Sequence, residues 1–160
     1  MIALNIPDVK VFMAKLLREG TFDSFELRSL IIDSFARFEI NGAAPTKEEG
    51  FCTWGTMRKY AFDIIKGESA PRAVKAVLGL NAEKVRAGFP NSAALFVNII
   101  FEGGKITLIT GQSPKSFSLD KSDEEKWDGA VRVFLTKNNI IHNEEINTQS
   151  KGEQETDEHN

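Results

Sequence analysis

The chain has 160 residues, of which 41% are hydrophobic and 27% charged, with a formal net charge of −3. These values are typical of a soluble globular protein and exclude collagen-like, low-complexity and wholly disordered chains. No apolar run reaches the roughly 18 to 20 residues that a membrane helix requires, so we expect no membrane span. The first residues lack the pattern of a signal peptide, and the single cysteine, Cys52, fits a reducing compartment, for which the cytoplasm is the default expectation.

The composition of residues 142–160 differs from that of the rest of the chain. This segment holds six acidic residues against one lysine, and its one aliphatic residue is Ile146. So little apolar surface cannot offset the entropy of ordering the backbone, which costs about 1 to 2 kcal/mol per residue. We therefore predict a single domain over 1–141 and a disordered acidic tail over 142–160. The tail would act as a solubilising terminus, or as an acidic strand for a basic face or a basic partner.

Three segments predict amphipathic helices, because their apolar residues recur with helical spacing. The first runs over residues 7–20 and the second over 53–67, each with capping or dipole-compatible residues at its start and a glycine at its end. The third begins with the capping-box pattern of residues 122–125, and its apolar stripe is Trp127, Ala130, Val131, Phe134 and Leu135. Asn81 is in addition a candidate cap for a short helix through Arg86.

Residues 22–40 alternate polar and apolar side chains, as strands do. The inward-facing parity switches near Leu30 to Ile32, which indicates a β-bulge or a bend. One straight strand of this length would exceed roughly 55 Å at about 3.3 Å per residue. We therefore expect a bent strand, or two consecutive strands, ending in a turn at 41–42. The later segment 70–80 fits a helix and a strand equally well.

The strongest β signal comes from two runs, 94–102 and 105–110, that flank Gly103-Gly104. Two glycines between β-rich runs predict a tight antiparallel hairpin. We expect a turn at 111–114 and a short third strand at 116–119. The order of elements predicts an α+β fold with an antiparallel sheet of about four to five strands, joined by hairpins, and about three helices packed against it.

Short motifs are spread over most of residues 1–140: Met1-Ile2-Ala3-Leu4, Asp8-Val9-Lys10, Thr21-Phe22-Asp23, Ile65-Lys66-Gly67, Thr110-Gly111, Leu119-Asp120-Lys121-Ser122 and Trp127-Asp128. In these motifs the chain resembles an uncharacterised family of small bacterial proteins, a domain of unknown function found mainly in anaerobic Gram-positive bacteria. The resemblance favours a strand over 72–80. It implies no reaction, ligand or catalytic residue.

Few residues of this chain suit catalysis or metal binding. Cys52 could act as a nucleophile only with a base beside it, and His142 and His159 fall at the edge of and within the predicted tail. These residues show no metal-ligand spacing. The glycine pair before Lys105 lacks the frame of a phosphate-binding loop. We therefore expect no metal, no cofactor and no catalytic residue, and the sequence favours a protein that is not an enzyme.

The aromatic residues indicate a packed core rather than a binding surface. The chain has 12 phenylalanines, 2 tryptophans and 1 tyrosine, whereas binding surfaces favour tyrosine, tryptophan and arginine. Trp54 and Trp127 each start an apolar helix stripe, so we predict that both pack in the core or at its boundary.

Residues 57–86 carry seven basic side chains against three acidic ones. If these side chains share one surface, that surface could bind phosphates, with Tyr60 stacking on bases. The candidate nucleic-acid-binding residues are Arg58, Lys59, Tyr60, Lys66, Arg72 and Lys75. The alternative is a solvated face with scattered charges, which the acidic character of the whole chain favours.

The sequence leaves three classes of function open. The first is a non-catalytic, cytoplasmic binding or interaction module, with a protein partner or a second copy as its ligand. The second is a nucleic-acid-associated protein that uses residues 57–86, with the acidic tail as an internal competitor. The third is an enzyme of unrecognised type, for which a deep pocket with convergent polar groups would argue.

Overall fold

The computed structural model describes residues 1–145 except 47, 49 and 68. In this part of the chain, seven strands form one antiparallel sheet in the order β3-β2-β4-β5-β6-β1-β7. The strands are β1 (Ala3–Ile6), β2 (Glu26–Asp33), β3 (Arg37–Asn41), β4 (Ala73–Gly79), β5 (Ser92–Glu102), β6 (Lys105–Pro114) and β7 (Asn143–Glu144). The helices are α1 (Val9–Leu17), α2 (Trp54–Ile65), α3 (Ala82–Gly88) and α4 (Ser122–Lys137). The α+β class with an antiparallel sheet is confirmed, but the described residues form seven strands and four helices rather than about four to five strands and about three helices.

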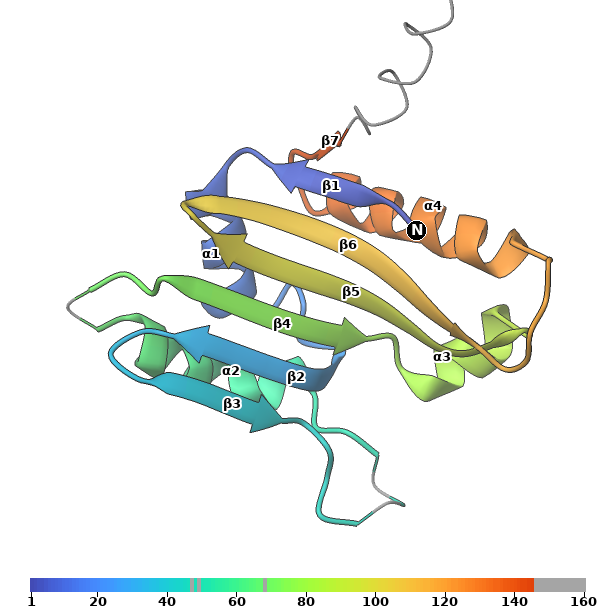
Figure 1. Ribbon diagram of the computed structural model, residues 1–160, viewed down its shortest axis with the longest axis horizontal. Coiled ribbons are helices and arrows are strands. Elements are labelled where there is room, and N and C mark those ends of the chain that lie inside the picture. Colours follow the sequence, from blue (N-terminus) through green and yellow to red (C-terminus); the bar gives the residue numbers. More distant parts are fainter. Residues whose placement is uncertain (47, 49, 68, 146–160) are drawn as a thin grey trace, which may run out of the picture.

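The helices α1, α2 and α4 lie on one face of the sheet, and α3 lies near one of its ends (Figure 1). Side chains on the helical face are buried, as Leu95, Val97 and Ile99 of β5 show, and they alternate with residues that point the other way. No helix of the described chain covers the opposite side, which we call the open face (Figure 1). The centre of the open face includes Ile31, Lys75, Val77, Phe96, Asn98, Ile100 and Ile109.

The helix α2 begins where its sequence predicts, whereas α1 begins at Val9, two residues later than expected. Asp8, expected inside the first turn of α1, is the cap itself, and its side chain accepts a hydrogen bond from the amide of Val11. Thr53 caps α2 and accepts a hydrogen bond from the amide of Thr56. Each cap provides a partner for an amide that the helix itself leaves unsatisfied.

Residues 22–40 contain two consecutive strands, β2 and β3, which is one of the two expected arrangements. The predicted β-bulge is present, but it lies between Leu27 and Ser29 rather than at the later position expected. The bulge allows both Leu27 and Leu30 to point into the core despite their odd spacing. Gly42 permits this geometry, because a Cβ atom there would lie 1.8 Å from the carbonyl oxygen of Leu27.

The central strands of the sheet agree with the sequence. The ambiguous segment 70–80 contains the strand β4, as the family resemblance favours. The hairpin of β5 and β6 is confirmed, with Glu102 opposite Lys105. Gly103 and Gly104 have φ values of +59° and +73°, a region of backbone space that glycine enters without steric cost.

The strand β1 has no counterpart among the strands that the sequence predicts. It lies between β6 and β7, where Leu4 stands opposite Leu108 on one side and Glu144 on the other. Leu4 and Ile6 are buried in the core. Four residues before a proline are too short for a strand pattern, and the partners of β1 are far away in the sequence.

Two predictions for the segment between β6 and α4 are wrong. Residues 111–114, expected as a turn, continue β6 to Pro114. Residues 116–119 form no strand, and the side chains of Phe117 and Leu119 are 93% and 86% exposed. The alternation of these residues is therefore a local pattern without a partner strand.

The helix α4 does not use the predicted capping box. Lys121 stands at its N-cap position and makes no side-chain hydrogen bond there. Asp123 is instead buried and accepts hydrogen bonds from the amide of Asn91 and the hydroxyl of Ser92, both at 2.9 Å. The acidic side chain thus connects the start of α4 to the start of β5.

The prediction places the start of the disordered tail too early, because its first residues take part in the fold. Asn143 and Glu144 form β7 and pair with β1. The side chain of Glu144 also pairs with Arg132 of α4. The rest of the predicted tail, 146–160, lies outside the described residues.

Candidate functional site

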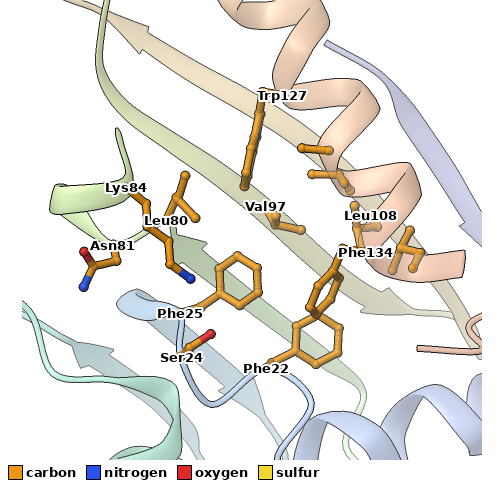
Figure 2. A pocket seen from close by; sticks show the side chains of 13 residues that line it. Phe22, Ser24, Phe25, Leu80, Asn81, Lys84, Val97, Leu108, Trp127 and Phe134 are labelled. Carbon is orange, nitrogen blue, oxygen red and sulfur yellow. The ribbon is translucent and has the colours of Figure 1, made fainter. Parts of the chain in front are cut away.

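An apolar cleft lies on the helical face of the sheet, between α4 and the segment that precedes β2 (Figure 2). Val97 of β5 and Leu108 of β6 form its floor. Its volume is about 250 Å³. The lining residues are Phe22, Ser24, Phe25, Leu80, Asn81, Lys84, Val97, Leu108, Trp127, Ala130, Val131, Phe134 and Leu135.

Three phenylalanine rings close one end of the cleft. The centroid of the Phe134 ring lies 5.3 Å from that of Phe22 and 5.4 Å from that of Phe25, and both contacts are edge-to-face. The ring of Phe12 packs against Phe22 in the same manner, at 5.5 Å. Such pairs contribute about 0.5 to 1.5 kcal/mol each beyond the area that they bury. This end of the cleft is therefore held in a defined shape.

Trp127 lies at the opposite end of the cleft (Figure 2). Its indole nitrogen donates a hydrogen bond to the carbonyl oxygen of Phe96 at 2.9 Å, and its ring meets Phe89 edge-to-face. The side chain is 4% exposed, so the prediction that Trp127 is buried is confirmed, although the residue also forms a wall of the cleft. Trp54, 1% exposed, lies in the core.

The helix α4 has a wider apolar stripe than the sheet can cover. Val131 and Leu135 are buried against the sheet, whereas Phe134 is half-buried and Ala130 is exposed. The sequence correctly predicts these residues as one stripe. Because α1 and α2 stand over the other half of the sheet, the outer part of the stripe faces the cleft instead of another helix.

Polar side chains are confined to the rim of the cleft. Ser24, Asn81 and Lys84 are exposed, and Figure 2 shows the side chain of Lys84 reaching from α3 towards Phe25. Asn81 caps α3 by accepting a hydrogen bond from the amide of Glu83. Neither the amino group of Lys84 nor the hydroxyl of Ser24 has a hydrogen-bond or ion-pair partner among the residues that the structure describes.

The wall formed by Phe22 and Phe25 is fixed through Asp23. Its carboxylate accepts two hydrogen bonds from the guanidinium of Arg58, at 2.8 and 3.0 Å. Its carbonyl oxygen accepts a hydrogen bond from the amide of Gly55. A Cβ atom at Gly55 would lie 3.0 Å from the Cβ of Asp23, so a glycine allows α2 to approach this segment closely.

The opposite wall, α4, is connected to the sheet by buried polar contacts. The hydroxyl of Thr110 donates a hydrogen bond of 2.6 Å to Asp128, which also lies 3.1 Å from the amino group of Met1. The same amino group contacts Glu124. Burial lowers the pKa of this amino group, but its bonds to Glu124 and Asp128 raise it by more, so the pKa is raised. The amino group in turn lowers the pKa of Glu124. With both walls anchored, the cleft is preformed.

The predicted basic region is divided among several surfaces. Lys59 and Tyr60 lie on α2 and Lys66 ends it, on the helical side of the sheet. The side chain of Lys66 pairs with Asp63. Arg58 is engaged with Asp23 at the cleft wall and is therefore a structural residue.

Two of the candidate nucleic-acid-binding residues lie elsewhere. Arg72 precedes β4, and Lys75 stands on the open face, opposite Ile31 and Ile100. The structure thus brings Arg58, Lys59, Tyr60 and Lys66 to one helix and separates Lys75 from them by the thickness of the sheet.

The remaining candidates for chemistry stay apart from the cleft. Cys52 is half-buried, in the strand-like segment beside Leu27. In the described part of the chain, no group of three or more histidine, cysteine or acidic residues is arranged to hold a metal ion. None of the described helices has the length and apolar character needed to cross a membrane.

Comparisons with known proteins identify a family but no activity. Residues 15–143 match a family described as a family of unknown function (DUF5721). No match was found among curated proteins or among solved structures. The resemblance noted in the sequence motifs is consistent with this match, which covers most of the chain. The chain therefore belongs to this family of unknown function, DUF5721.

Proposed function

We propose that this protein is a non-catalytic binding module that holds a small amphipathic molecule in the cleft beside α4. The observation that carries this proposal is the composition of the cleft, with aromatic and aliphatic walls and polar side chains only at the rim. Ligand sites generally combine a mainly apolar lining with a few convergent polar groups.

The size of the cleft supports a ligand of moderate length. Its volume is about 250 Å³, whereas an engineered apolar cavity of roughly 150 Å³ is sufficient to bind benzene. A short hydrocarbon chain would lie between Trp127 and the ring cluster of Phe22, Phe25 and Phe134. Burying each methylene group there contributes about 0.8 kcal/mol.

The charge at the rim indicates which end group the ligand carries. Lys84 supplies a positive charge, and Ser24 and Asn81 supply groups that hydrogen-bond to oxygen atoms. A carboxylate at this end of the ligand would pair with Lys84 while the hydrocarbon body fills the cleft. Because the described lining residues include no carboxylate or imidazole, the cleft favours binding over acid–base chemistry.

Calorimetric titration with octanoate and with 1-octanol tests this proposal. We expect both probes to bind the wild-type protein, and octanoate to bind about 1.4- to 5-fold more tightly, since an exposed ion pair contributes about 0.2 to 1 kcal/mol. In Lys84→Gln the difference between the probes should disappear, while octanol binding stays unchanged.

The matched variants for this test are Ala130→Trp and Val133→Trp. Both add the same indole to α4, but Ala130 lines the cleft, whereas Val133 is 65% exposed on another side of the helix. We expect Ala130→Trp to abolish binding and Val133→Trp to leave it intact. Absence of binding to the wild-type protein, or equal binding by both variants, would refute the proposal.

The nucleic-acid hypothesis stays a prediction, and so does a cytoplasmic location. The positions of Arg58, in an ion pair with Asp23, and of Lys75, on the open face, give little support to one continuous phosphate-binding surface. Mobility-shift assays at low salt, with the full chain and with residues 142–160 deleted, decide this question. Binding that increases on deletion and falls steeply with salt would favour nucleic acid.

A further inference from the structure

The two edges of the sheet are built differently. At one edge, β7 has two residues, a length that limits the addition of a further strand. At the other edge, β3 has five residues, with no proline and no irregularity in its pairing with β2 (Figure 1). None of the described strands pairs with the outer side of β3, and α2 packs against α1 and β2. Such an edge is a template for another strand.

The backbone of β3 presents hydrogen-bonding groups along this edge. The amide of Gly42, directly after β3, donates a hydrogen bond of 3.1 Å to the carbonyl oxygen of Arg28. Hydrogen-bonded pairs alternate along an antiparallel ladder, so the even-numbered residues of β3 direct their amides and carbonyls towards β2. The amides and carbonyls of Arg37, Glu39 and Asn41 therefore point away from β2, towards the free edge.

The side chains beside these backbone groups carry opposite charges. Arg37 and Glu39 are 56% and 65% exposed. The Nε atom of Arg37 donates a hydrogen bond of 2.8 Å to Oε1 of Glu39, and Nη1 donates to both carboxylate oxygens of Asp33 at 3.0 Å. Neither Nη2 of Arg37 nor Oε2 of Glu39 has a hydrogen-bond partner among the described residues. A charged donor and a charged acceptor are thus available at the edge.

Two aromatic rings lie at the same edge. Phe35, in the turn between β2 and β3, is 83% exposed, and its ring centroid lies 5.3 Å from that of Phe38. Phe38 is half-buried and stands opposite the core residue Ile32, so it lies on the helical face. Removing more of these rings from water would favour the addition of a strand here.

We propose that two copies of this chain pair their β3 strands in antiparallel orientation, so that the two sheets continue as one. A two-fold axis through Phe38 brings Arg37 of each copy opposite Glu39 of the other and Phe38 opposite its counterpart. Opposite charges and aromatic pairs across strands are both stabilising. An axis at Arg37 or at Glu39 would instead place like charges opposite each other, so charge complementarity selects the register centred on Phe38.

The backbone supports the same register. Arg37 and Glu39, whose amides and carbonyls point outwards, become two hydrogen-bonded pairs, and about four backbone hydrogen bonds join the copies. A contact of one strand from each copy is small, so we expect a dissociation constant on the order of 10 to 100 µM. The cleft lies over β5 and β6, away from β3, so failure of ligand binding would leave this inference unaffected.

Sedimentation equilibrium of the full chain, over concentrations that bracket this constant, tests the inference. Arg37→Glu and Glu39→Arg each place like charges opposite each other, and each variant alone should have its dissociation constant raised roughly 10-fold or more. An equimolar mixture of the two variants should dimerise again, because every facing pair in the heterodimer has opposite charges. Arg86→Glu makes the same change of charge at an exposed position of α3 and should dimerise like the wild type.

Circular dichroism establishes that each variant is folded before its mass is interpreted. The double variant Arg37→Glu/Glu39→Arg keeps the charge composition and should dimerise with itself, which gives a result even if a single variant does not fold. A wild-type chain that is monomeric over the whole range would overturn the inference and leave the edge to a strand of another protein. So would a dimer that both folded single variants leave unchanged, or folded single variants whose mixture stays monomeric.

Discussion

At the scale of single residues, two glycines have opposite roles. A Cβ atom at Gly42 would lie 1.8 Å from the carbonyl oxygen of Leu27, so any side chain there displaces the backbone at the β-bulge. A Cβ atom at Gly129, inside α4, would meet nothing within 4 Å. The sequence pattern around Gly42 indicates only a turn after β3, and nothing in it shows the close approach to Leu27.

We predict that Gly42→Ala lowers the free energy of unfolding by about 3 kcal/mol, because the sheet must shift to admit the methyl group. Gly129→Ala should raise the free energy of unfolding by about 0.5 to 1 kcal/mol, since alanine is the better helix former. Urea unfolding of the two variants measures both values. Equal effects of the two substitutions would contradict the close approach at Gly42.

At the scale of elements, the start of α4 distinguishes local from tertiary stabilisation. The sequence 122–125 predicts a capping box, in which Ser122 stabilises the helix. In the structure Asp123 accepts hydrogen bonds from β5 instead, and the hydroxyl of Ser92 also accepts one from Gln112 at 2.6 Å. The buried polar network thus spans α4, β5 and β6.

We predict that Asp123→Ala lowers the free energy of unfolding by about 2 to 3 kcal/mol, because it leaves the buried hydroxyl of Ser92 and the amide of Asn91 without their acceptor. Ser122→Ala should change it by less than about 0.5 kcal/mol, as for an ordinary surface substitution. Chemical denaturation of both variants provides the measurement. The reverse order of effects would support the capping box.

At the scale of the whole molecule, β7 sets the end of the ordered sheet. Its two residues pair with β1, and Glu144 forms an exposed ion pair with Arg132. Two-residue strands and exposed ion pairs contribute little to stability. The predicted domain boundary at residue 141 therefore lies just before a marginal element.

We predict that a chain ending at residue 141 folds, and that its free energy of unfolding is lower than that of a chain ending at 145 by about 1 kcal/mol or less. The amide spectrum of the cleft residues, such as Trp127 and Phe134, should be the same in both chains. Thermal unfolding and two-dimensional NMR provide the comparison. Loss of cooperative unfolding in the shorter chain would show that β7 is essential.

The sequence predicts residues of the candidate cleft individually but not as a site. Trp127, Val131 and Phe134 belong to the stripe expected for the last helix, and Phe25 belongs to a segment in which apolar and polar residues alternate. The sequence does not show that α4 and Phe22 lie close together in space, because they are about 100 residues apart in the chain. The sequence does give one indication of the cleft. The apolar stripe of α4 includes Ala130 and Phe134, so it is wider than the face that the helix buries against the sheet.

The amino-acid sequence by itself determined the helices, the β5–β6 hairpin, the two-strand character of residues 22–40 and the α+β class. These features depend on periodicity and turn chemistry within short segments, which act before the chain has folded. Only the tertiary structure decided that β1 inserts between β6 and β7, that Asp123 bonds to β5 and that a cleft remains beside α4. These features depend on which faces meet across long stretches of chain, and local patterns carry no information about that choice.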